Sequence, residues 1–142
     1  MGILGRLLGI DALGKKLGIE RTPEEVDDLV NEGNRYLRER RIKKAINIYK
    51  EVLDINQAHV VAWNNLGVAY TEYLLYEKAI EACCEAVEIS PEYADAWFNL
   101  GNAYFKNKQY NQADDAYTQA IHILPEHQPA KHNRELCRKH IR

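Results

Sequence analysis

The sequence lacks the features that would point to export, a membrane or a large anionic partner. Across 142 residues, no apolar run approaches the roughly 18 to 20 residues that span a bilayer. The N-terminus has no basic flank followed by an unbroken apolar core. The formal net charge is only −2, so no overall basic balance favours nucleic acid or anionic lipid. There are three cysteines, and two of them, Cys83 and Cys84, are neighbours, which argues against a disulfide framework. We therefore expect a protein of the reducing cytoplasm.

Motifs for catalysis and for cofactors are missing as well. No Gly-rich phosphate loop, nucleophile elbow, CxxC pair or HExxH motif occurs. His127, His132, Cys137 and His140 lie close in sequence, but only Cys137 and His140 share a helical face, and two ligands do not close a metal site. We expect no enzymatic activity, no cofactor and no bound metal.

A repeat of 34 residues is the strongest feature that is present. Gly33, Gly67 and Gly101 are each 34 residues apart. The same chemistry returns around them, in the sets Leu29, Trp63 and Trp97; Tyr36, Tyr70 and Tyr104; Ala45, Ala79 and Ala113; Tyr49, Cys83 and Tyr117; Val52, Ala86 and Ala120; with Pro91 and Pro125 closing two units. A fixed period of this length is typical of a stacked repeat architecture.

Within a unit, the apolar residues have helical spacing. Trp63, Leu66, Gly67 and Tyr70 form one stripe, and a second stripe begins at Ala79, with steps of three and four residues in both. Each unit is therefore predicted to be a helical hairpin. Small residues on the facing stripes, Gly67 against Ala79, would let the two backbones approach closely. Proline then ends the second helix, because it cannot continue the hydrogen-bond ladder.

These residues resemble the tetratricopeptide repeat family, which carries Trp, Leu-Gly and Tyr on the first helix and Ala, an aromatic residue, Ala and Pro on the second. The resemblance covers residues 24–127 as three repeats, at about 26–59, 60–93 and 94–127, and 128–142 would form a C-terminal capping helix. It implies an all-α fold, a right-handed superhelical stack of antiparallel helix pairs.

The sequence departs from this family pattern in two places. The first unit has Leu29, Glu32 and Gln57 where the pattern has Trp, Leu and Pro, as suits an atypical terminal repeat. The turns inside the three hairpins hold Arg40, Leu74 and Lys108 instead of glycine. These turns must either avoid a positive φ or accept strain.

The resemblance also implies that the first helices line a concave face that holds a peptide of a partner protein. Taking Asn65 as inward, helical phase gives the residues of this face. The candidate peptide-binding residues are Asn31, Asn34, Arg38, Asn64, Asn65, Val68, Glu72, Phe98, Asn99, Asn102, Phe105 and Lys106.

Asn31, Asn65 and Asn99 would form a ladder with one amide per repeat. An amide offers both a donor and an acceptor, so each could pair with a peptide backbone. One branch of the family clamps the C-terminal carboxylate of heat-shock chaperones with two asparagines, which Asn34 and Asn65 match, and several basic residues. Its basic positions are here Val30, Asp95 and Asn99. Chaperone-tail binding is therefore disfavoured, because the anion would lack charged donors.

Residues 1–20 form a Gly-rich amphipathic segment, with Ile3, Leu7, Ile10, Leu13 and Leu17 at helical steps. Its surface of contact could be the repeats, a second copy or a lipid interface, of which the first two are favoured. Basic residues cluster around 35–44 and 131–142, which we interpret as solvated faces in preference to sites for RNA or an acidic partner.

The preferred function is a protein-interaction adaptor that binds a peptide or helix in its groove. The rival is a self-assembling scaffold, a homo-oligomer built through residues 1–20; nucleic acid and membrane binding are less favoured.

Overall fold

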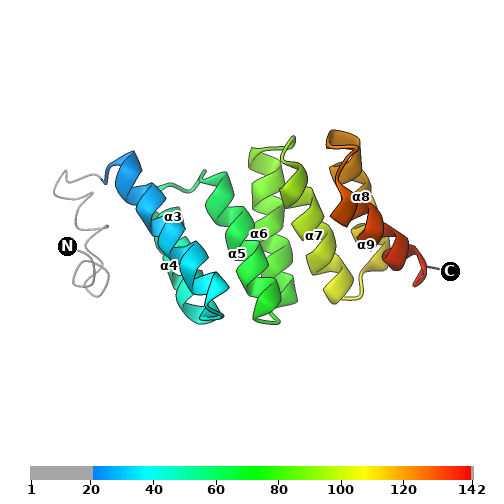
Figure 1. The fold of residues 1–142 in the computed structure, drawn as a ribbon, viewed down its shortest axis with the longest axis horizontal. Helices are drawn as coiled ribbons and strands as arrows, with labels where there is room; N and C mark the ends of the chain where they lie inside the picture. The colour runs from blue at the N-terminus through cyan, green and yellow to red at the C-terminus, as the bar shows by residue number, and fades with distance from the viewer. Residues whose placement is uncertain (1–20, 142) are drawn as a thin grey trace.

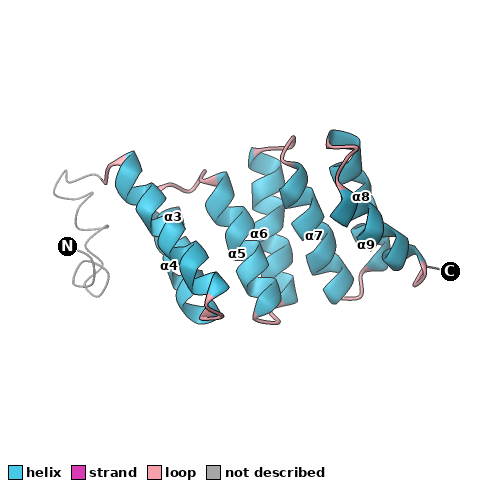
Figure 2. Cartoon of the chain, in the orientation of Figure 1, coloured by secondary structure: helices cyan, strands magenta, loops and turns pink. Residues whose placement is uncertain are grey.

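The computed structural model describes residues 21–141 as seven consecutive α-helices (Figures 1 and 2). Their bounds are α3 Pro23–Arg38, α4 Ile42–Ile55, α5 Val60–Glu72, α6 Tyr76–Ile89, α7 Ala94–Lys106, α8 Tyr110–Ile123 and α9 Gln128–Arg138. The amphipathic segment predicted at residues 1–20 lies outside the described residues. Within 21–141, no helix is both long and apolar enough to cross a membrane.

The helices pack as antiparallel pairs that stack side by side in two layers (Figure 1). The first helix of each pair contacts the first helices of its neighbours, α3 with α5, α5 with α7 and α7 with α9. The second helices α4, α6 and α8 contact the first helices on either side of them. The predicted all-α stack of helix pairs is thus confirmed. We call the surface formed by α3, α5, α7 and α9 the inner face.

Each pair is held close by a glycine on its first helix. A Cβ built on Gly33 would lie 2.6 Å from Tyr49 Cε1, and one on Gly101 would lie 2.5 Å from Tyr117 Cε1. In the middle pair, a Cβ on Gly67 would lie 2.3 Å from Cys83 Sγ, while the Ala79 carbonyl oxygen is 3.4 Å away. The predicted close approach is present, but the residue opposite the glycine is the fully buried Tyr49, Cys83 or Tyr117 rather than the alanine four positions earlier.

The turn inside each pair accepts a positive φ. Arg40, Leu74 and Lys108 have φ of 61°, 63° and 62°. In each turn, this left-handed residue lets two backbone N–H groups reach carbonyls of the preceding helix: Leu74 donates to Thr71 and Leu75 donates to Tyr70, for example. These paired bonds satisfy carbonyls that would otherwise be orphaned at the helix end. Of the two alternatives open from the sequence, the turns therefore adopt the strained one.

Helix α9 continues the pattern of first helices at the C-terminal end of the stack. Ala130 and Cys137 are buried, at the positions of Ala96 and Ala103 one period earlier. Where a first helix would have its glycine, α9 has the exposed residue Glu135. A charged side chain at this position suits a helix whose outer side faces water instead of a partner helix.

Candidate peptide-binding face

Among the residues that the structure describes, the inner face has a larger and a smaller hollow. The first has a volume of about 600 Å³ and the second about 340 Å³. The first hollow is lined by Asn64, Asn65, Val68, Tyr93, Asp95, Phe98, Asn99, Leu124, Glu126, His127, Gln128 and Pro129. The second hollow is lined by Thr71, Glu72, Asn102, Phe105, Lys106, Tyr117, Asn133 and Leu136.

Nine of the twelve residues selected from the sequence line one of these hollows. Asn64, Asn65, Val68, Phe98 and Asn99 line the first, and Glu72, Asn102, Phe105 and Lys106 line the second. The remaining three, Asn31, Asn34 and Arg38, lie on α3 outside both hollows. The hollows therefore concentrate the candidate residues on α5 and α7.

Several of the candidate amides are already bonded to one another between repeats. Asn34 Oδ1 accepts from the hydroxyl of Tyr49 at 2.6 Å and from Asn65 Nδ2 at 2.9 Å. Two repeats further on, Asn102 Oδ1 accepts from the hydroxyl of Tyr117 at 2.8 Å and from Asn133 Nδ2 at 3.0 Å. Each of these asparagines satisfies a buried phenol and joins two repeats.

The middle pair uses a different bond. Asn99 Nδ2 donates to Asn64 Oδ1 at 2.9 Å, and Asn64 is only 5% exposed. The expected ladder of Asn31, Asn65 and Asn99 is thus not a row of free amides, because the donors of Asn65 and Asn99 bind neighbouring repeats. The coincidence of asparagine with tyrosine 15 residues later, in the first and third units only, was the signal for this network.

His127 lies in the wall of the first hollow, and sequence reasoning considered it only as a metal ligand. Its Nδ1 accepts from the Ala130 N–H at 3.1 Å, which caps α9. Its Nε2 lies 3.0 Å from Asp95 Oδ1, and its ring centroid lies 4.9 Å from that of Phe98. Because Nδ1 is an acceptor, Nε2 is the ring nitrogen that donates to Asp95.

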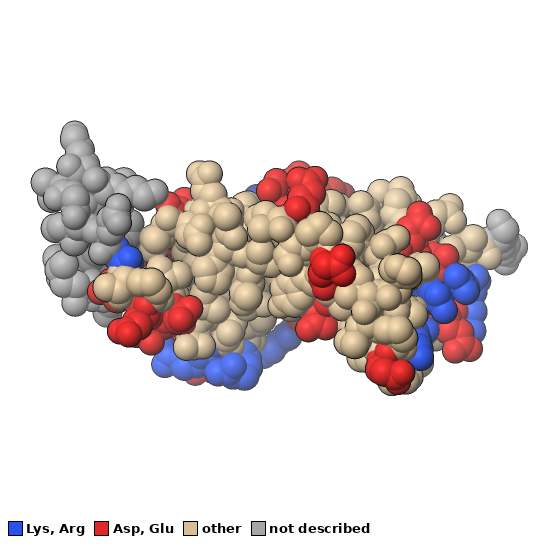
Figure 3. Space-filling model, turned by 90° about the horizontal axis from the view of Figure 1, so that it is seen from above, with Lys and Arg blue, Asp and Glu red and all other residues tan. Residues whose placement is uncertain are grey.

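The charge of the inner face is uneven. Within residues 21–141, Asp95 and Glu126 line the first hollow, and no Lys or Arg does. The second hollow has one residue of each sign, Glu72 and Lys106. Basic side chains instead gather towards the two ends of the molecule (Figure 3). The first hollow is therefore the more acidic of the two.

The thiol of Cys83 is buried in the core. Burial, and then the neighbouring Cys84, raise the pKa of the Cys83 thiol to about 12, so it remains protonated and unreactive near neutral pH. Within residues 21–141, no group of three or more His, Cys, Asp or Glu side chains is placed to hold a metal ion.

Comparisons with known families identify two stretches of the chain. A family model described as TPR repeat matches residues 76–108, and one described as tetratricopeptide repeat matches residues 94–127. No curated protein matches the chain.

Solved structures resemble the chain over most of its length. The Sgt2 TPR domain from Aspergillus fumigatus is 31% identical, with 86% of this chain and 82% of that chain covered and a TM-score of 0.81. The Arabidopsis OM64 TPR domain is 25% identical, with 83% and 98% covered and a TM-score of 0.79. The first TPR of Spaghetti (RPAP3) bound to the HSP90 peptide SRMEEVD is 21% identical, with 85% and 96% covered and a TM-score of 0.80.

Proposed function

This chain belongs to the tetratricopeptide repeat family, and from that premise we propose that it is a protein-interaction adaptor whose inner face binds an extended peptide segment of a partner protein. The observation that carries this proposal is the first hollow. It is a concave space of about 600 Å³ that combines apolar, amide and carboxylate groups from α5, α7 and the start of α9. A mixed lining of this kind can position a peptide and bury part of a side chain.

The first hollow offers an apolar floor beside polar groups. Val68 and Phe98 are half-buried, so each keeps apolar surface that a ligand can cover. Covering such surface contributes about 25 cal/mol per Å². The amides contribute less than a free ladder would, because their Nδ2 groups are engaged between repeats. Affinity is therefore expected to depend on side chains of the partner more than on its backbone.

The likeness to domains that bind peptides supports the adaptor role, and the charge of the site modifies it. A related structure holds an HSP90 peptide that ends in two glutamates, valine and aspartate. In this chain, Asp95 and Glu126 would face such an anionic tail, with no lysine or arginine in the first hollow to balance them. We propose that the partner segment is not an acidic chaperone tail.

Blocking the first hollow tests the proposal. Peptides would be selected from a random peptide library against the full chain, and their affinities would be measured by fluorescence anisotropy. Val68→Arg places a long side chain in the hollow and should weaken binding at least about tenfold. Ile89→Arg is the matched control, because Ile89 is 39% exposed at the end of α6 in the other layer. Thermal unfolding of both variants checks the fold.

Equal affinity of the selected peptides for the Val68→Arg variant and the unchanged chain would contradict the proposal. So would a larger loss in the Ile89→Arg variant than in the Val68→Arg variant, because it would move the binding surface to the other layer.

A further inference from the structure

The first hollow has a defined charge, which follows from its lining. Asp95 and Glu126 supply two carboxylates, and no Lys or Arg lines it. The ring of His127 meets Asp95 through Nε2, while its Nδ1 accepts the N–H of Ala130. The hollow thus presents a formal charge of −2 from Asp95 and Glu126. A carboxylate pair inside a concave surface concentrates its field on whatever enters.

One of these carboxylates is held in place by the core. Asp95 Oδ1 is bonded to Nε2 of His127, whose side chain is only 7% exposed, yet the Asp95 side chain is itself 64% exposed. One end of the carboxylate is therefore anchored on a buried group while the rest remains accessible. An acceptor that is already oriented loses less conformational entropy when it binds a donor.

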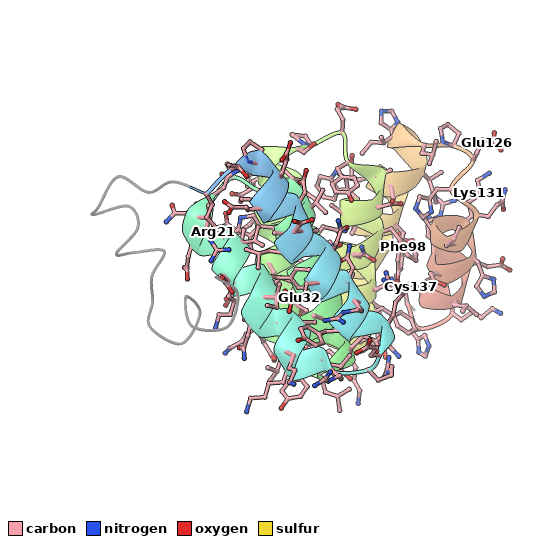
Figure 4. The ribbon with its side chains drawn as sticks, turned by 60° about the vertical axis from the view of Figure 1, so that its left-hand side comes forward. Arg21, Glu32, Phe98, Glu126, Lys131 and Cys137 are labelled. Atoms are coloured by element: carbon pink, nitrogen blue, oxygen red, sulfur yellow. The ribbon has the colours of Figure 1, made fainter. Side chains whose placement is uncertain are left out.

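Aromatic side chains lie beside the anchored carboxylate. Phe98 packs on the ring of His127 and lines the hollow, and Tyr93 lines it near Asp95. Figure 4 shows Phe98 on α7 and Glu126 at the turn that leads into α9. A cation beside an aromatic face is stabilised by the ring quadrupole, and the aliphatic stem of lysine or arginine packs well on such a ring.

We propose that the first hollow binds a lysine or arginine side chain of the partner segment, with the cation between Asp95 and Glu126 and its stem against Phe98. The proposal rests on the function proposed above and specifies the partner: a basic segment. It is supported by charge complementarity, because a lysine or arginine side chain pairs with the two carboxylates and packs on the aromatic wall.

Short peptides of defined charge test this proposal without knowledge of the natural partner. The probe is an acetylated and amidated five-residue peptide with arginine at its centre, flanked by glycine and alanine. The comparison peptides carry citrulline, which has nearly the same shape without the charge, or glutamate. Binding to the full ¹⁵N-labelled chain would be followed by shifts of backbone amide signals. The arginine peptide should shift signals around Asp95 and Phe98 and should bind at least about tenfold more tightly than the citrulline peptide.

Asp95→Asn is the decisive variant. Asparagine can still accept from His127 Nε2 through its side-chain oxygen, so the substitution removes the charge while keeping the anchor. It should lower the affinity of the arginine peptide at least about fivefold and leave the affinity of the citrulline peptide unchanged. Asp115→Asn is the matched control, because Asp115 is exposed on α8 and does not line the hollow.

Three results would overturn the proposal: equal binding of the arginine and citrulline peptides, tighter binding of the glutamate peptide, or equal losses in the Asp95→Asn and Asp115→Asn variants. Library-selected peptides separate this failure from failure of the proposed function. If Val68→Arg weakens the binding of these peptides and Asp95→Asn does not, the hollow binds a segment that is not basic. If they are insensitive to both variants, the first hollow does not bind them, and the proposed function fails.

Discussion

The middle helix pair, α5 with α6, differs from the pairs on either side of it at the buried position opposite the glycine. In the flanking pairs, a tyrosine ring covers the glycine of the first helix, and in the middle pair a cysteine covers it. Tyr49, Cys83 and Tyr117 are all at most 1% exposed. The close approach of the two helices at the glycine is therefore compatible with side chains of very different size, tyrosine and cysteine.

The inner face changes together with the core. Each buried tyrosine hydroxyl donates to an asparagine on the first helix, Tyr49 to Asn34 and Tyr117 to Asn102. In the middle pair, Cys83 has no hydroxyl, and Val68, which lines the first hollow, stands at the position of these asparagines. A buried phenol requires an acceptor, whereas a thiol does not. Some polar residues of the inner face therefore serve the core by accepting hydrogen bonds from it, and Val68 has no such role.

The largest effect should come from adding one methyl group at the glycine of a flanking pair. In Gly101→Ala, the new Cβ would lie within 3.0 Å of three Tyr117 ring atoms. That ring cannot swing away, because it is buried and its hydroxyl is bonded to Asn102. We expect a loss of about 3 kcal/mol in the free energy of unfolding, measured with urea.

The middle pair should tolerate the same change better once its sulfur is removed. In Gly67→Ala, the one severe contact is with Cys83 Sγ, and the next atoms are 3.4 Å away. Adding Cys83→Ala should return stability to within about 1 kcal/mol of the unchanged chain, because the new methyl occupies the space of the sulfur. If the double variant is no more stable than Gly67→Ala alone, backbone contact rather than the sulfur limits this pair.

The next effect tests whether the asparagines serve the core. Asn34→Val gives the first pair the residue found in the middle pair, and it leaves the Tyr49 hydroxyl and Asn65 Nδ2 without their acceptor. We expect a loss of about 2 kcal/mol in the free energy of unfolding. The reciprocal change Val68→Asn should cost less than about 1 kcal/mol, because the side chain is half-buried beside a hollow.

Tyr49→Phe separates the contributions to the Asn34 result. In the Tyr49→Phe background, Asn34→Val should cost less than it does alone, because the phenol no longer needs an acceptor. Equal costs in the two backgrounds would show that the bond from Tyr49 to Asn34 contributes nothing, and that the bond between Asn34 and Asn65 carries the whole effect.

The architecture was predictable from the sequence because the residues that determine it recur at a fixed period. The 34-residue spacing of Gly33, Gly67 and Gly101 predicted the paired helices. The residue that contacts each glycine was harder to predict, because helical phase alone does not say whether Ala79 or Cys83 approaches Gly67 more closely. The sign of φ at Leu74 was left open for a similar reason: the absence of glycine cannot distinguish a relaxed turn from a strained one.

The candidate face was predictable by helical phase, but the state of its side chains was not. Phase placed Val68 and Phe98 inward, where the structure places both in the first hollow. It could not reveal that Asn65 and Asn99 donate to neighbouring repeats, because those bonds depend on the spacing between stacked pairs. His127 was missed as a lining residue, since its place depends on the turn that leads into α9.

Alkaline pH should distinguish the two kinds of pair. Burial raises the pKa of Tyr49 from 10 to about 12, and burial followed by Cys84 raises that of Cys83 from 9 to about 12. In both, the folded chain favours the protonated form, so their contributions to stability are complete below the unfolded pKa and are lost as pH rises towards the folded one. The loss from the middle pair should therefore begin about one pH unit earlier.

Urea unfolding between pH 8 and 11 measures this order. Cys83→Ala should flatten the decline that begins near pH 9, which can reach about 1.4 kcal/mol per pH unit for one group. Tyr49→Phe should leave the curve unchanged until about pH 10. If Tyr49→Phe leaves the decline above pH 10 as steep as in the unchanged chain, the phenol is less buried in solution than the structure indicates.

The smallest effect, and the one expected to stabilise the protein, concerns the strained turns that all three pairs share. Leu74 has φ of 63° and is 70% exposed, so its side chain contributes little packing to balance the strain. A left-handed backbone conformation costs a residue with a Cβ about 1–2 kcal/mol. Glycine avoids this cost but destabilises the folded chain by roughly 0.5–1 kcal/mol, because it loses more conformational entropy on folding. Leu74→Gly should therefore raise the free energy of unfolding by about 0.5 kcal/mol.

The same substitution in the first pair provides the comparison, because Arg40 also has a positive φ but forms an exposed ion pair with Glu72. Exposed pairs contribute about 0–1 kcal/mol, so Arg40→Gly should gain less than Leu74→Gly. Lys108→Gly should resemble Leu74→Gly, since its backbone has nearly the same φ. A loss of stability on Leu74→Gly would mean that Leu74, despite its exposure, supports the turn through its side chain. The strain would then be balanced locally in the middle pair, and the three turns would differ in energy although they share one geometry.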